Sequence, residues 1–596
     1  MTATAHPMQE RYPLRGAIVL ALTVSLVCAG ILGFVYLELF PPEGWYDDHS
    51  FPASVSWFVP YAVEQVQNAW TNTSGIPLSE WFGSFSNAVW YEAVLQFDLA
   101  SAYEPRLLAI AVVSVASGIV AAFLFLKGSI PRDSLIHISG RRSWRGYEAL
   151  REVRKILKPD IRNVGRGLFI APSVATDRSR EVQHMGLVGT TGSGKSTILR
   201  FLAEQALARG DKILLHDTKG DILAGFPTDS FVLLAPHDQR GLAWDVARDV
   251  VTDQDARELS ARLVPESSDP MWSGAARDIH TGIIVTLQRT KLLTWSWQDL
   301  ADAAFLPMAE LLTLLRDHYP TAARYIELDA ATGAPTRTTH GILITLWANV
   351  VGIVMPLAKA WGHAPPERRI SIAAWITDDT GALPKTLVLQ RSPRHPTLST
   401  AWIGAVVESL ANVAAGPDLP ESASRRVFLF LDEFAQLGRM TGFRQLLEVG
   451  RSKGLACVLA LQDIQQLIGL YGDADAKTIL TLLGLKIVGK LPTGPSAVFV
   501  ADEFIGRREV VWQEQVRSTS RAMGAGQSVT VNHSTQSHTA TISVVTPHYL
   551  ESRLGVDRNG VTALLLGLGD VFELRWPLNA WPIRRAATQP AEWTQG

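Results

Sequence analysis

The stretch Gly189-Thr-Thr-Gly-Ser-Gly-Lys-Ser196 decides the fold, because it matches the phosphate-binding pattern G-x-x-x-x-G-K-[ST] at every fixed position. A short apolar run, Met185 to Val188, precedes it, and Ser196 to Arg209 follows with helical character. The motif therefore has the strand–loop–helix context that it requires. The alternative, a glycine-rich turn that only resembles the motif, does not account for that context. The sequence predicts an α/β fold built around a P-loop ATPase site.

The pattern assigns a role to each conserved position of the loop. Glycines let backbone N–H groups close around phosphates, and the helix N-terminus adds partial positive charge. Lys195 is expected to contact the β- and γ-phosphates, and Ser196 to bind Mg²⁺. We therefore expect ATP and Mg²⁺ as cofactors. The predicted nucleotide-binding residues are Gly189, Thr190, Thr191, Gly192, Ser193, Gly194, Lys195, Ser196 and Thr197.

A P-loop needs an acidic partner at the end of a neighbouring strand, and the run Val427 to Leu431 is followed by two acids. Five apolar residues are typical of a buried strand of a parallel sheet, whose carboxyl end is where ligands bind. Asp432 is expected to hold Mg²⁺ through water, and Glu433 to act as the base that orients the attacking water. The alternative is that the two acids only cap the helix that follows.

Two further polar residues are candidates for catalysis. Gln462 ends the next apolar run, Cys457 to Leu461, and an amide there can sense the γ-phosphate. Arg451 is predicted on the helix between the two strands, from which it could reach a neighbouring subunit's nucleotide as an arginine finger. Each could instead be an ordinary polar surface residue.

The spacing between the motifs predicts an insertion. Lys195 and Asp432 are 237 residues apart, whereas a βαβ unit takes about 30 residues. Thr252 to Trp361 has helical periodicity, so we predict an all-α domain at 251–365 between nucleotide-binding parts at 127–250 and 366–596. The runs Ser371 to Ile376 and Thr386 to Gln390 are predicted strands. Arg517 to Ser543 is predicted to be a polar loop or an edge hairpin.

Two apolar runs near the N-terminus are long enough to cross a bilayer, which takes about 20 residues. Gly16 to Leu37 and Leu107 to Leu126 contain no charged residue, and we predict transmembrane helices at 16–39 and 107–126. A cleaved signal peptide is the alternative for the first run, but its apolar core is too long and no small-x-small site follows.

Charge asymmetry predicts the topology of these spans. The segment 41–105 contains eight acidic residues and no Lys or Arg, whereas basic residues flank both spans on the other side. Because Lys and Arg are retained in the cytoplasm, residues 1–15 and everything after 126 are predicted to be cytoplasmic, with 41–105 periplasmic. The protein is then a multi-pass membrane protein with both termini inside.

Composition limits the alternatives. The formal net charge of −2 gives no general indication of nucleic-acid binding, and two cysteines, Cys28 and Cys457, exclude a disulfide framework. The segment from Lys127 to Arg166 has eleven basic and four acidic residues. It fits a juxtamembrane stop signal, although a first contact for nucleic acid stays open.

Taken with these motifs, the chain resembles the type IV secretion coupling proteins of conjugation, of the TraD, TraG and TrwB type. The resemblance covers nearly the whole chain. It rests on the two spans, the P-loop, and a series of shorter motifs in the same order. These are His216-Asp-Thr-Lys-Gly-Asp221, Ala235-Pro-His-Asp238 with Trp244-Asp245, Asp269-Pro-Met-Trp272 with Ala275-Ala-Arg277, Leu431-Asp-Glu-Phe434, Arg451-Ser-Lys-Gly454 and Leu461-Gln462.

The resemblance implies a RecA-like homo-hexamer docked on the bacterial inner membrane. ATP hydrolysis would pump single-stranded DNA, with its attached relaxase, from the relaxosome to the type IV secretion channel. The all-α domain would cap the cytoplasmic mouth of the ring. Only a short segment follows Trp576, where some relatives carry a long acidic tail, so the resemblance does not indicate which relaxosome is served.

Two other functions stay open from the sequence. An FtsK-like DNA translocase is also a membrane-anchored ring motor, but it usually has more spans and a C-terminal winged helix. A membrane receptor for protein effectors that transports no DNA would have the same motor residues. DNA stimulation of ATP hydrolysis would separate these functions.

Overall fold

The computed structural model describes residues 13–35, 100–129, 136–267, 269–329, 332–521 and 529–595. It divides into two compact units, residues 1–136 and residues 137–596. The predicted periplasmic loop, residues 41–105, lies almost entirely outside the described residues, as do most of residues 1–15.

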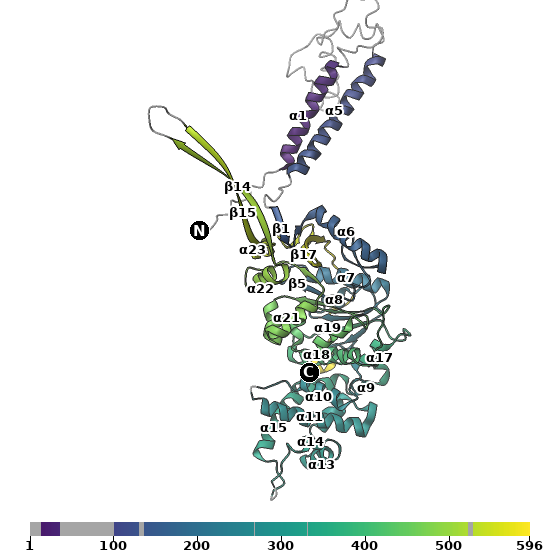
Figure 1. The fold of residues 1–596 in the computed structure, drawn as a ribbon. Coiled ribbons are helices and arrows are strands. Elements are labelled where there is room, and N and C mark those ends of the chain that lie inside the picture. Colours follow the sequence, from purple (N-terminus) through teal and green to yellow (C-terminus); the bar gives the residue numbers. More distant parts are fainter. Residues whose placement is uncertain are drawn as a thin grey trace, which may run out of the picture. The chain divides into compact units, whose positions relative to one another are not determined.

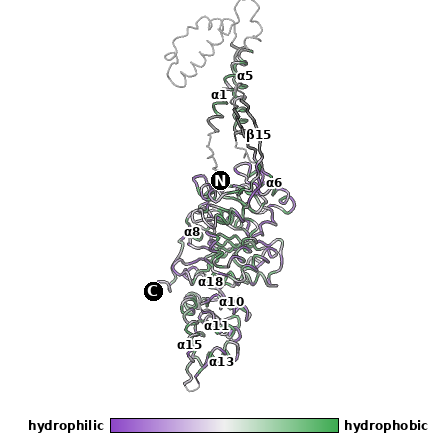
Figure 2. Tube along the Cα trace, turned by 60° about the vertical axis from the view of Figure 1, so that its left-hand side comes forward, coloured by the Kyte–Doolittle hydropathy of each residue, from purple (hydrophilic) through white to green (hydrophobic). Residues whose placement is uncertain are grey.

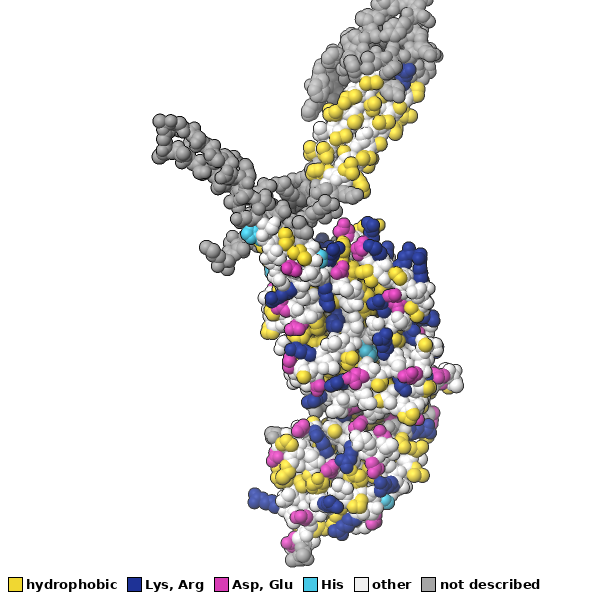
Figure 3. All heavy atoms as spheres, viewed as in Figure 1, with side chains coloured by type: hydrophobic (Ala, Val, Ile, Leu, Met, Phe, Trp, Pro, Cys, Tyr) yellow, Lys and Arg dark blue, Asp and Glu magenta, His cyan; other side chains and the backbone are white. Residues whose placement is uncertain are grey.

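The first unit contains two apolar helices, α1 (Pro13–Phe34) and α5 (Ala100–Ser129). They pack closely where a Cβ added to Gly118 would lie 2.1 Å from Ser25 Oγ, a small-residue contact typical of membrane helix pairs. Their outer faces are hydrophobic (Figure 3), with Leu26 of α1 and Ile119 of α5 among the exposed side chains. By length and composition, residues 105–125 of α5 can cross a membrane, and residues 17–33 of α1 form a shorter apolar helix.

Two stretches of the second unit are also long and apolar enough to cross a membrane, Arg337–Trp361 and Pro396–Ala415. Both contribute fully buried side chains to the core of that unit, including Leu346 and Trp402. Their apolar character is therefore accounted for by packing within the second unit.

The second unit is organised around a large mixed sheet (Figure 1), in the order β2-β18-β17-β13-β5-β12-β11-β6-β10-β7, with β16 paired to β17. The strands from β13 to β7 are parallel, and β17 runs antiparallel to β13. The bounds of these strands are β2 (Ser143–Trp144), β5 (Met185–Val188), β6 (Lys212–Asp217), β7 (Val232–Leu234), β10 (Thr386–Gln390), β11 (Val427–Leu431), β12 (Leu455–Leu461), β13 (Leu485–Val488), β16 (Gly555–Asp557), β17 (Gly560–Leu568) and β18 (Asp570–Trp576).

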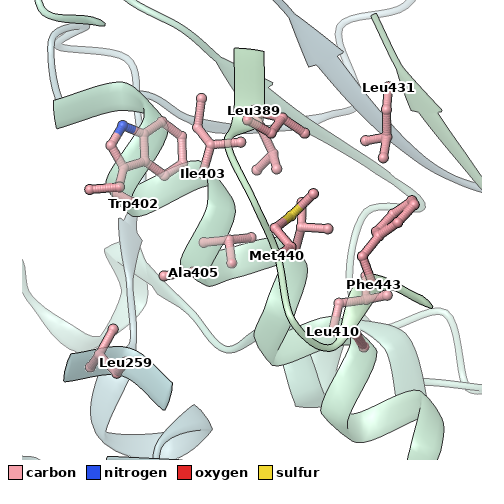
Figure 4. Close-up of a cluster of buried hydrophobic side chains, with 14 of the residues drawn as sticks. Leu259, Leu389, Trp402, Ile403, Ala405, Leu410, Leu431, Met440 and Phe443 are labelled. Carbon is pink, nitrogen blue, oxygen red and sulfur yellow. The ribbon is translucent and has the colours of Figure 1, made fainter. Parts of the chain in front are cut away.

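Side chains alternate between the two faces of this sheet and form two hydrophobic cores. Leu429 and Leu431 of β11 lie in one core, with α18 (Pro396–Ala415) and α10 (Asp253–Leu263), as Figure 4 shows for Leu431, Trp402 and Leu259. Phe430 of the same strand lies in the other core, with α6 (Gly146–Val164) and α7 (Lys195–Arg209). Figure 2 shows hydrophobic residues toward the middle of the second unit and hydrophilic residues toward its outside.

Residues 253–361 form a helical insert between β8 (Ala243–Trp244) and β9 (Arg369–Ile370), two short strands that pair in parallel. The regular elements described within the insert are helical (Figure 1). Asp269 caps the longest helix by accepting from Met271 N, followed by Pro270 at its first turn. The helices of the insert are α10, α11 (Pro270–Lys291), η2 (Leu292–Thr294), α12 (Trp297–Ala303), α13 (Met308–His318), α14 (Pro320–Ala323), α15 (Arg337–Asn349), η3 (Val350–Val354) and α16 (Met355–Trp361).

The prediction of a strand at Ser371 to Ile376 is wrong. Residues Ile372–Thr377 form helix α17, and Ser371 caps it by accepting a hydrogen bond from Ala374 N. Ile372, Trp375 and Ile376 share its buried face, with the three- and four-residue spacing of a helix. The cap and this spacing outweigh the apolar character that suggested a strand.

The polar segment near residue 520 belongs to a long hairpin. Strands β14 (Arg507–Arg521) and β15 (Val529–Ser543) pair antiparallel over 15 residues each, and β1 (Ile136–Gly140) joins them in a three-stranded sheet. Within the hairpin, the paired residues Trp512 and His538 stack with ring centroids 5.4 Å apart. Of the two predicted forms, loop or hairpin, the hairpin is present.

Residues 577–595, here called the C-terminal segment, return across the second unit after β18. Trp581 Nε1 and Asn579 Nδ2 donate to Glu204 of α7. Further along, Gln589 N donates to Asp238 Oδ2 at 2.9 Å, and Trp593 Nε1 donates to the carbonyl of Pro236 at 2.6 Å. The segment therefore contacts both the P-loop helix and the loop after β7.

The remaining described elements connect these parts. They are β3 (Arg166–Ala171), β4 (Val174–Asp177), α8 (Asp221–Gly225), α9 (Val246–Asp249), η4 (Pro366–Arg368), η5 (Phe434–Leu437), α19 (Phe443–Gly450), α20 (Ile464–Tyr471), α21 (Asp473–Leu482), α22 (Pro495–Phe499), η6 (Val500–Ile505), α23 (Pro547–Ser552) and η7 (Glu592–Thr594).

Candidate nucleotide-binding site

The phosphate-binding motif forms the loop between β5 and helix α7. Gly194, the residue before α7, has φ +95°, a conformation that favours glycine. A Cβ there would also lie 2.4 Å from Val561 Cγ1. Gly194 is therefore required twice, by backbone conformation and by the close approach of β17.

Backbone hydrogen bonds anchor the start of the loop. Gly189 N donates to the carbonyl of Leu461 at 3.0 Å, and Thr190 N donates to the carbonyl of Lys490 at 2.9 Å. Among the described residues, the amides of Gly192, Gly194 and Lys195 have no acceptor. Such free amides at a helix N-terminus suit an anion such as a phosphate.

Lys195 is buried at the first position of α7. Its Nζ donates to the carbonyl of Gly189 at 2.5 Å and to that of Thr190 at 3.0 Å, so its ammonium lies against the loop. Burial lowers the pKa of Lys195, and the nearby charges of Asp432 and Glu433 oppose that shift. The lysine and the acid pair are thus close enough to interact.

The acid pair lies at the carboxyl end of β11, and both side chains are buried. Burial, and then the charge of Glu433, raise the pKa of Asp432 to about 6. Glu433 has φ +49°, which is uncommon for a residue with a side chain and is found where function sustains strain. Glu433 is the residue that precedes the short helix η5, so this conformation lies at the turn from β11 into that helix.

Two glutamines contact the carboxylate of Glu433. Gln462, at the end of β12, donates from Nε2 to Oε1 at 2.5 Å, and Gln436 of η5 donates from Nε2 to Oε2. The sequence predicted only that Gln462 ends a strand, and the structure shows that its side chain contacts Glu433. Gln436 was not singled out, although its position three residues after Glu433 is a usual distance for a contact within one turn.

The end of β6 also contacts the acid pair, and sequence reasoning gave its residues no role. His216 is fully buried, which lowers its pKa to about 4, so its ring is neutral and donates from Nδ1 to the carbonyl of Asp432 at 2.7 Å. Thr218 Oγ1 donates to Asp432 Oδ2 at 3.3 Å. The sequence signal that could have indicated these contacts was the motif His216 to Asp221, which was noted only as part of the family resemblance.

The structure does not bring Arg451 to this site. Helix α19 ends at Gly450, so Arg451 follows the helix rather than lying on it. Seven residues of β12 separate it from the end where Gln462 lies, which is roughly 20 Å of strand. Arg451 lies instead near His184, whose pKa is lowered to about 4 by burial and secondarily by the charge of Arg451.

The donor set fits a nucleotide-bound magnesium ion. Among the described residues, no group of three His, Cys, Asp or Glu side chains could hold a metal by itself. Mg²⁺ usually takes one or two protein ligands and completes its shell with phosphates and water. Ser196, the second residue of α7, and Asp432 are the residues that would hold it.

The sequence model of the type IV secretion-system coupling protein DNA-binding domain matches residues 168–559, which is well over half of the chain. This chain belongs to the type IV secretion-system coupling protein family. The match includes the P-loop, the helical insert and the acid pair, so the resemblance inferred from the motifs is confirmed.

Individual coupling proteins agree with this family. The coupling protein TraD of Escherichia coli (strain K12) is 25% identical over 371 residues, which are 60% of this chain and 48% of TraD. The chain thus spans about half the length of that relative. The conjugative coupling protein TrwBdeltaN70 in its unbound monoclinic form has a TM-score of 0.60 at 20% identity, covering 78% of this chain and all of that one.

A second TrwB structure contains a nucleotide. TrwB in complex with ADP and Mg²⁺ has a TM-score of 0.59 at 21% identity, covering 76% of this chain and 96% of that chain. These likenesses show that the second unit of the coupling protein has the TrwB-like mixed α/β fold.

Proposed function

We propose that this coupling protein is a membrane-anchored, RecA-like P-loop ATPase. It would use ATP and Mg²⁺ to pump single-stranded DNA, with its attached relaxase, from a relaxosome to a type IV secretion channel. The observation that carries the proposal is the convergence of Lys195, Asp432, Glu433 and Gln462 at one edge of the sheet. The crystallisation of TrwB with ADP and Mg²⁺ supports the choice of cofactors.

Each of the site residues has a defined part in the proposed mechanism. The free amides of the loop bind the phosphates, and Lys195 exchanges its carbonyl partners for the β- and γ-phosphates. Glu433 orients the attacking water, and Gln462 holds the carboxylate of Glu433 in place. Mg²⁺ bound with the nucleotide supplies positive charge at the phosphates.

Assembly as a homo-hexamer would bring the positive charge of Arg451 to a nucleotide site that Arg451 does not reach within its own chain. Arg451 lies at the other end of β12 from Gln462, and we propose that it completes a neighbour's site as an arginine finger in trans. On the face shown in Figure 3, basic and acidic side chains of the second unit are interspersed. Contacts to DNA phosphates are then shared among subunits, each of which provides a few.

The apolar helices α1 and α5 are proposed to anchor the protein in the bacterial inner membrane. The lack of Lys and Arg in residues 41–105 supports a periplasmic loop and two cytoplasmic termini. The nucleotide-binding unit and the helical insert would then be cytoplasmic, where ATP and the relaxosome are found.

The test is ATP hydrolysis by the full-length protein in detergent, with and without single-stranded DNA. Lys195→Ala should abolish hydrolysis and weaken nucleotide binding, whereas Glu433→Gln should bind ATP without turning it over. Lys477→Ala, which removes an exposed lysine of α21 that pairs with Asp473, is the control and should behave as wild type. Normal turnover in either site variant would show that the site is misassigned.

DNA stimulation tests the transport function separately. Single-stranded DNA should raise the rate, and the stimulation should fall as salt rises because phosphate contacts release counterions. An ATPase that is indifferent to DNA would favour a receptor for protein effectors.

A further inference from the structure

The end of β6 and the residues that follow it contact the acid pair at three points. His216 Nδ1 lies 2.7 Å from the carbonyl oxygen of Asp432, and Thr218 Oγ1 lies 3.3 Å from Asp432 Oδ2. Lys219 Nζ lies 3.9 Å from Glu433 Oε1. Three of four consecutive residues therefore touch Asp432 or Glu433, although 214 to 216 residues of sequence separate the partners.

The backbone that carries Lys219 is held in place from inside. The buried carboxylate of Asp217 accepts from the amides of Lys219 at 3.2 Å, Gly220 at 2.8 Å and Leu223 at 2.8 Å. One side chain thus fixes the turn between β6 and α8. The direction in which Lys219 leaves the turn is set by this arrangement.

The turn is also confined from outside. Gly220 has φ +81°, and a Cβ there would lie 2.9 Å from Gln390 Nε2 and 3.1 Å from Ala587 Cβ. Gln390 Nε2 itself donates to the carbonyl of Ala587 at 2.6 Å. The C-terminal segment therefore packs directly against this turn and limits the space around Gly220.

Glu433 needs a cationic neighbour at this position. Its carboxylate is buried beside that of Asp432, and like charges repel strongly where water is excluded. Among the described residues, Lys219 is the cation that forms an ion pair with Glu433, whereas Lys195 donates to loop carbonyls. The side chain of Lys219 is 60% exposed, so it provides charge while keeping its own hydration.

We propose that Lys219 is a positioning residue for Glu433, an inference that rests on the proposed ATPase function. Its ammonium opposes the repulsion between the two carboxylates and holds Oε1 of Glu433 where Gln462 also contacts it. Glu433 then stays directed toward the water that attacks the terminal phosphate. Lys219 acts on the base and leaves nucleotide binding to Lys195 and the loop amides.

The experiment separates turnover from binding in the full-length protein in detergent. Lys219→Met removes the charge but keeps the apolar stem, and it should lower kcat about 10-fold. This is less than the roughly 100-fold that a 1 Å misplacement can cost, because Gln462 and Gln436 still hold the carboxylate of Glu433. The Kd of a fluorescent ATP analogue should stay within about twofold of wild type, because the phosphate-binding residues are untouched. Lys219→Arg restores the charge and should recover most of kcat.

The outcomes distinguish this role from others. A loss of nucleotide affinity in Lys219→Met would make Lys219 a phosphate-binding residue and overturn the proposal, as would an unchanged kcat. Equal losses in Lys219→Met and Lys219→Arg would show that charge is not what matters. Lys477→Met, the matched exposed lysine, should leave both quantities unchanged. If wild-type protein itself does not hydrolyse ATP, it is the proposed function that fails.

Discussion

A buried ion pair joins the helical insert to helix α18, which packs against the large sheet, and its contribution to stability can be tested by substitution. Arg262 Nε of α10 lies 2.9 Å from Glu408 Oε2 of α18, and the two side chains are only 12% and 5% exposed. Glu408 Oε1 accepts from both N and Oγ1 of Thr441 at 2.7 Å, and Arg262 Nη1 donates to the carbonyl of Arg439. The pair therefore also holds the loop that follows η5, the short helix after Glu433.

Glu408→Gln keeps the shape of the side chain and removes its charge, which leaves the Arg262 guanidinium uncompensated. Burial already lowers the pKa of Arg262, which shows that desolvation opposes its charge. Breaking a buried pair from one side typically costs about 3–5 kcal/mol. Because about 1.4 kcal/mol is a factor of ten, 3 kcal/mol corresponds to roughly 150-fold in the local opening equilibrium.

The assay is hydrogen–deuterium exchange of the full-length protein in detergent. Amides of α10 and of residues 439–442 should exchange roughly 150-fold faster in Glu408→Gln than in wild type. The control is Asp253→Asn at the start of the same helix, where Asp253 pairs with Arg289 at 3.4 Å but both side chains are about half exposed. An exposed pair contributes about 1 kcal/mol or less, so exchange should change less than about fivefold.

Equal exchange in Glu408→Gln and Asp253→Asn would refute this reasoning. The double variant Arg262→Met with Glu408→Met provides a second check, because replacing both charges by apolar groups often restores stability. If it exchanges as fast as Glu408→Gln, the cost does not come from an unpaired charge.

Three further predictions test other parts of the molecule. A reporter fused at Trp70 should read as periplasmic and one fused after Lys127 as cytoplasmic, because Lys and Arg are excluded from the loop between the spans; a cytoplasmic signal at Trp70 would contradict the topology. Arg451→Ala should abolish the rise of ATPase rate per subunit with protein concentration and DNA while ATP binding persists, and a wild-type rate independent of concentration would count against a finger acting in trans. His280 is fully buried, which lowers its pKa to about 4, so the unfolded state binds more protons than the folded state between pH 4 and about 6.5. The free energy of unfolding should therefore fall by up to about 1.4 kcal/mol per pH unit as the pH drops from about 6.5 to 4. Thermal unfolding of His280→Asn should show a shallower decline over that window, and identical pH profiles would show that His280 does not cause the loss of stability.

The parts of the site that depend on local sequence could be predicted. The P-loop and the strand ending in Asp432 and Glu433 are each specified by a few consecutive residues, because a buried parallel strand and a tight turn have strong local signals. The same holds for Gln462, which needed only the end of its strand. These residues meet because carboxyl ends of parallel strands share one edge of the sheet.

Contacts between distant segments could not be predicted. Lys219 and Glu433 meet only because β6 and β11 are neighbours, and nothing in the spacing of the two motifs specifies that order. Sequence proximity is likewise a poor guide to distance: Arg451 is close to Gln462 in sequence, yet strand β12 places the two residues at its opposite ends. Ser371 to Ile376 was misassigned because a six-residue apolar run fits a strand and a short helix equally well.

The C-terminal segment changes what a truncation of this protein would mean. Ending the chain at Trp576 would remove the hydrogen-bond donors of Glu204 on the P-loop helix and one donor of Asp238. It would also uncover Phe226, whose ring meets that of Trp581 edge-on with centroids 5.7 Å apart. Removing or tagging this end should therefore disturb the packing of the P-loop helix itself. If a shortened protein fails to hydrolyse ATP, that failure is no evidence that the missing residues bind DNA.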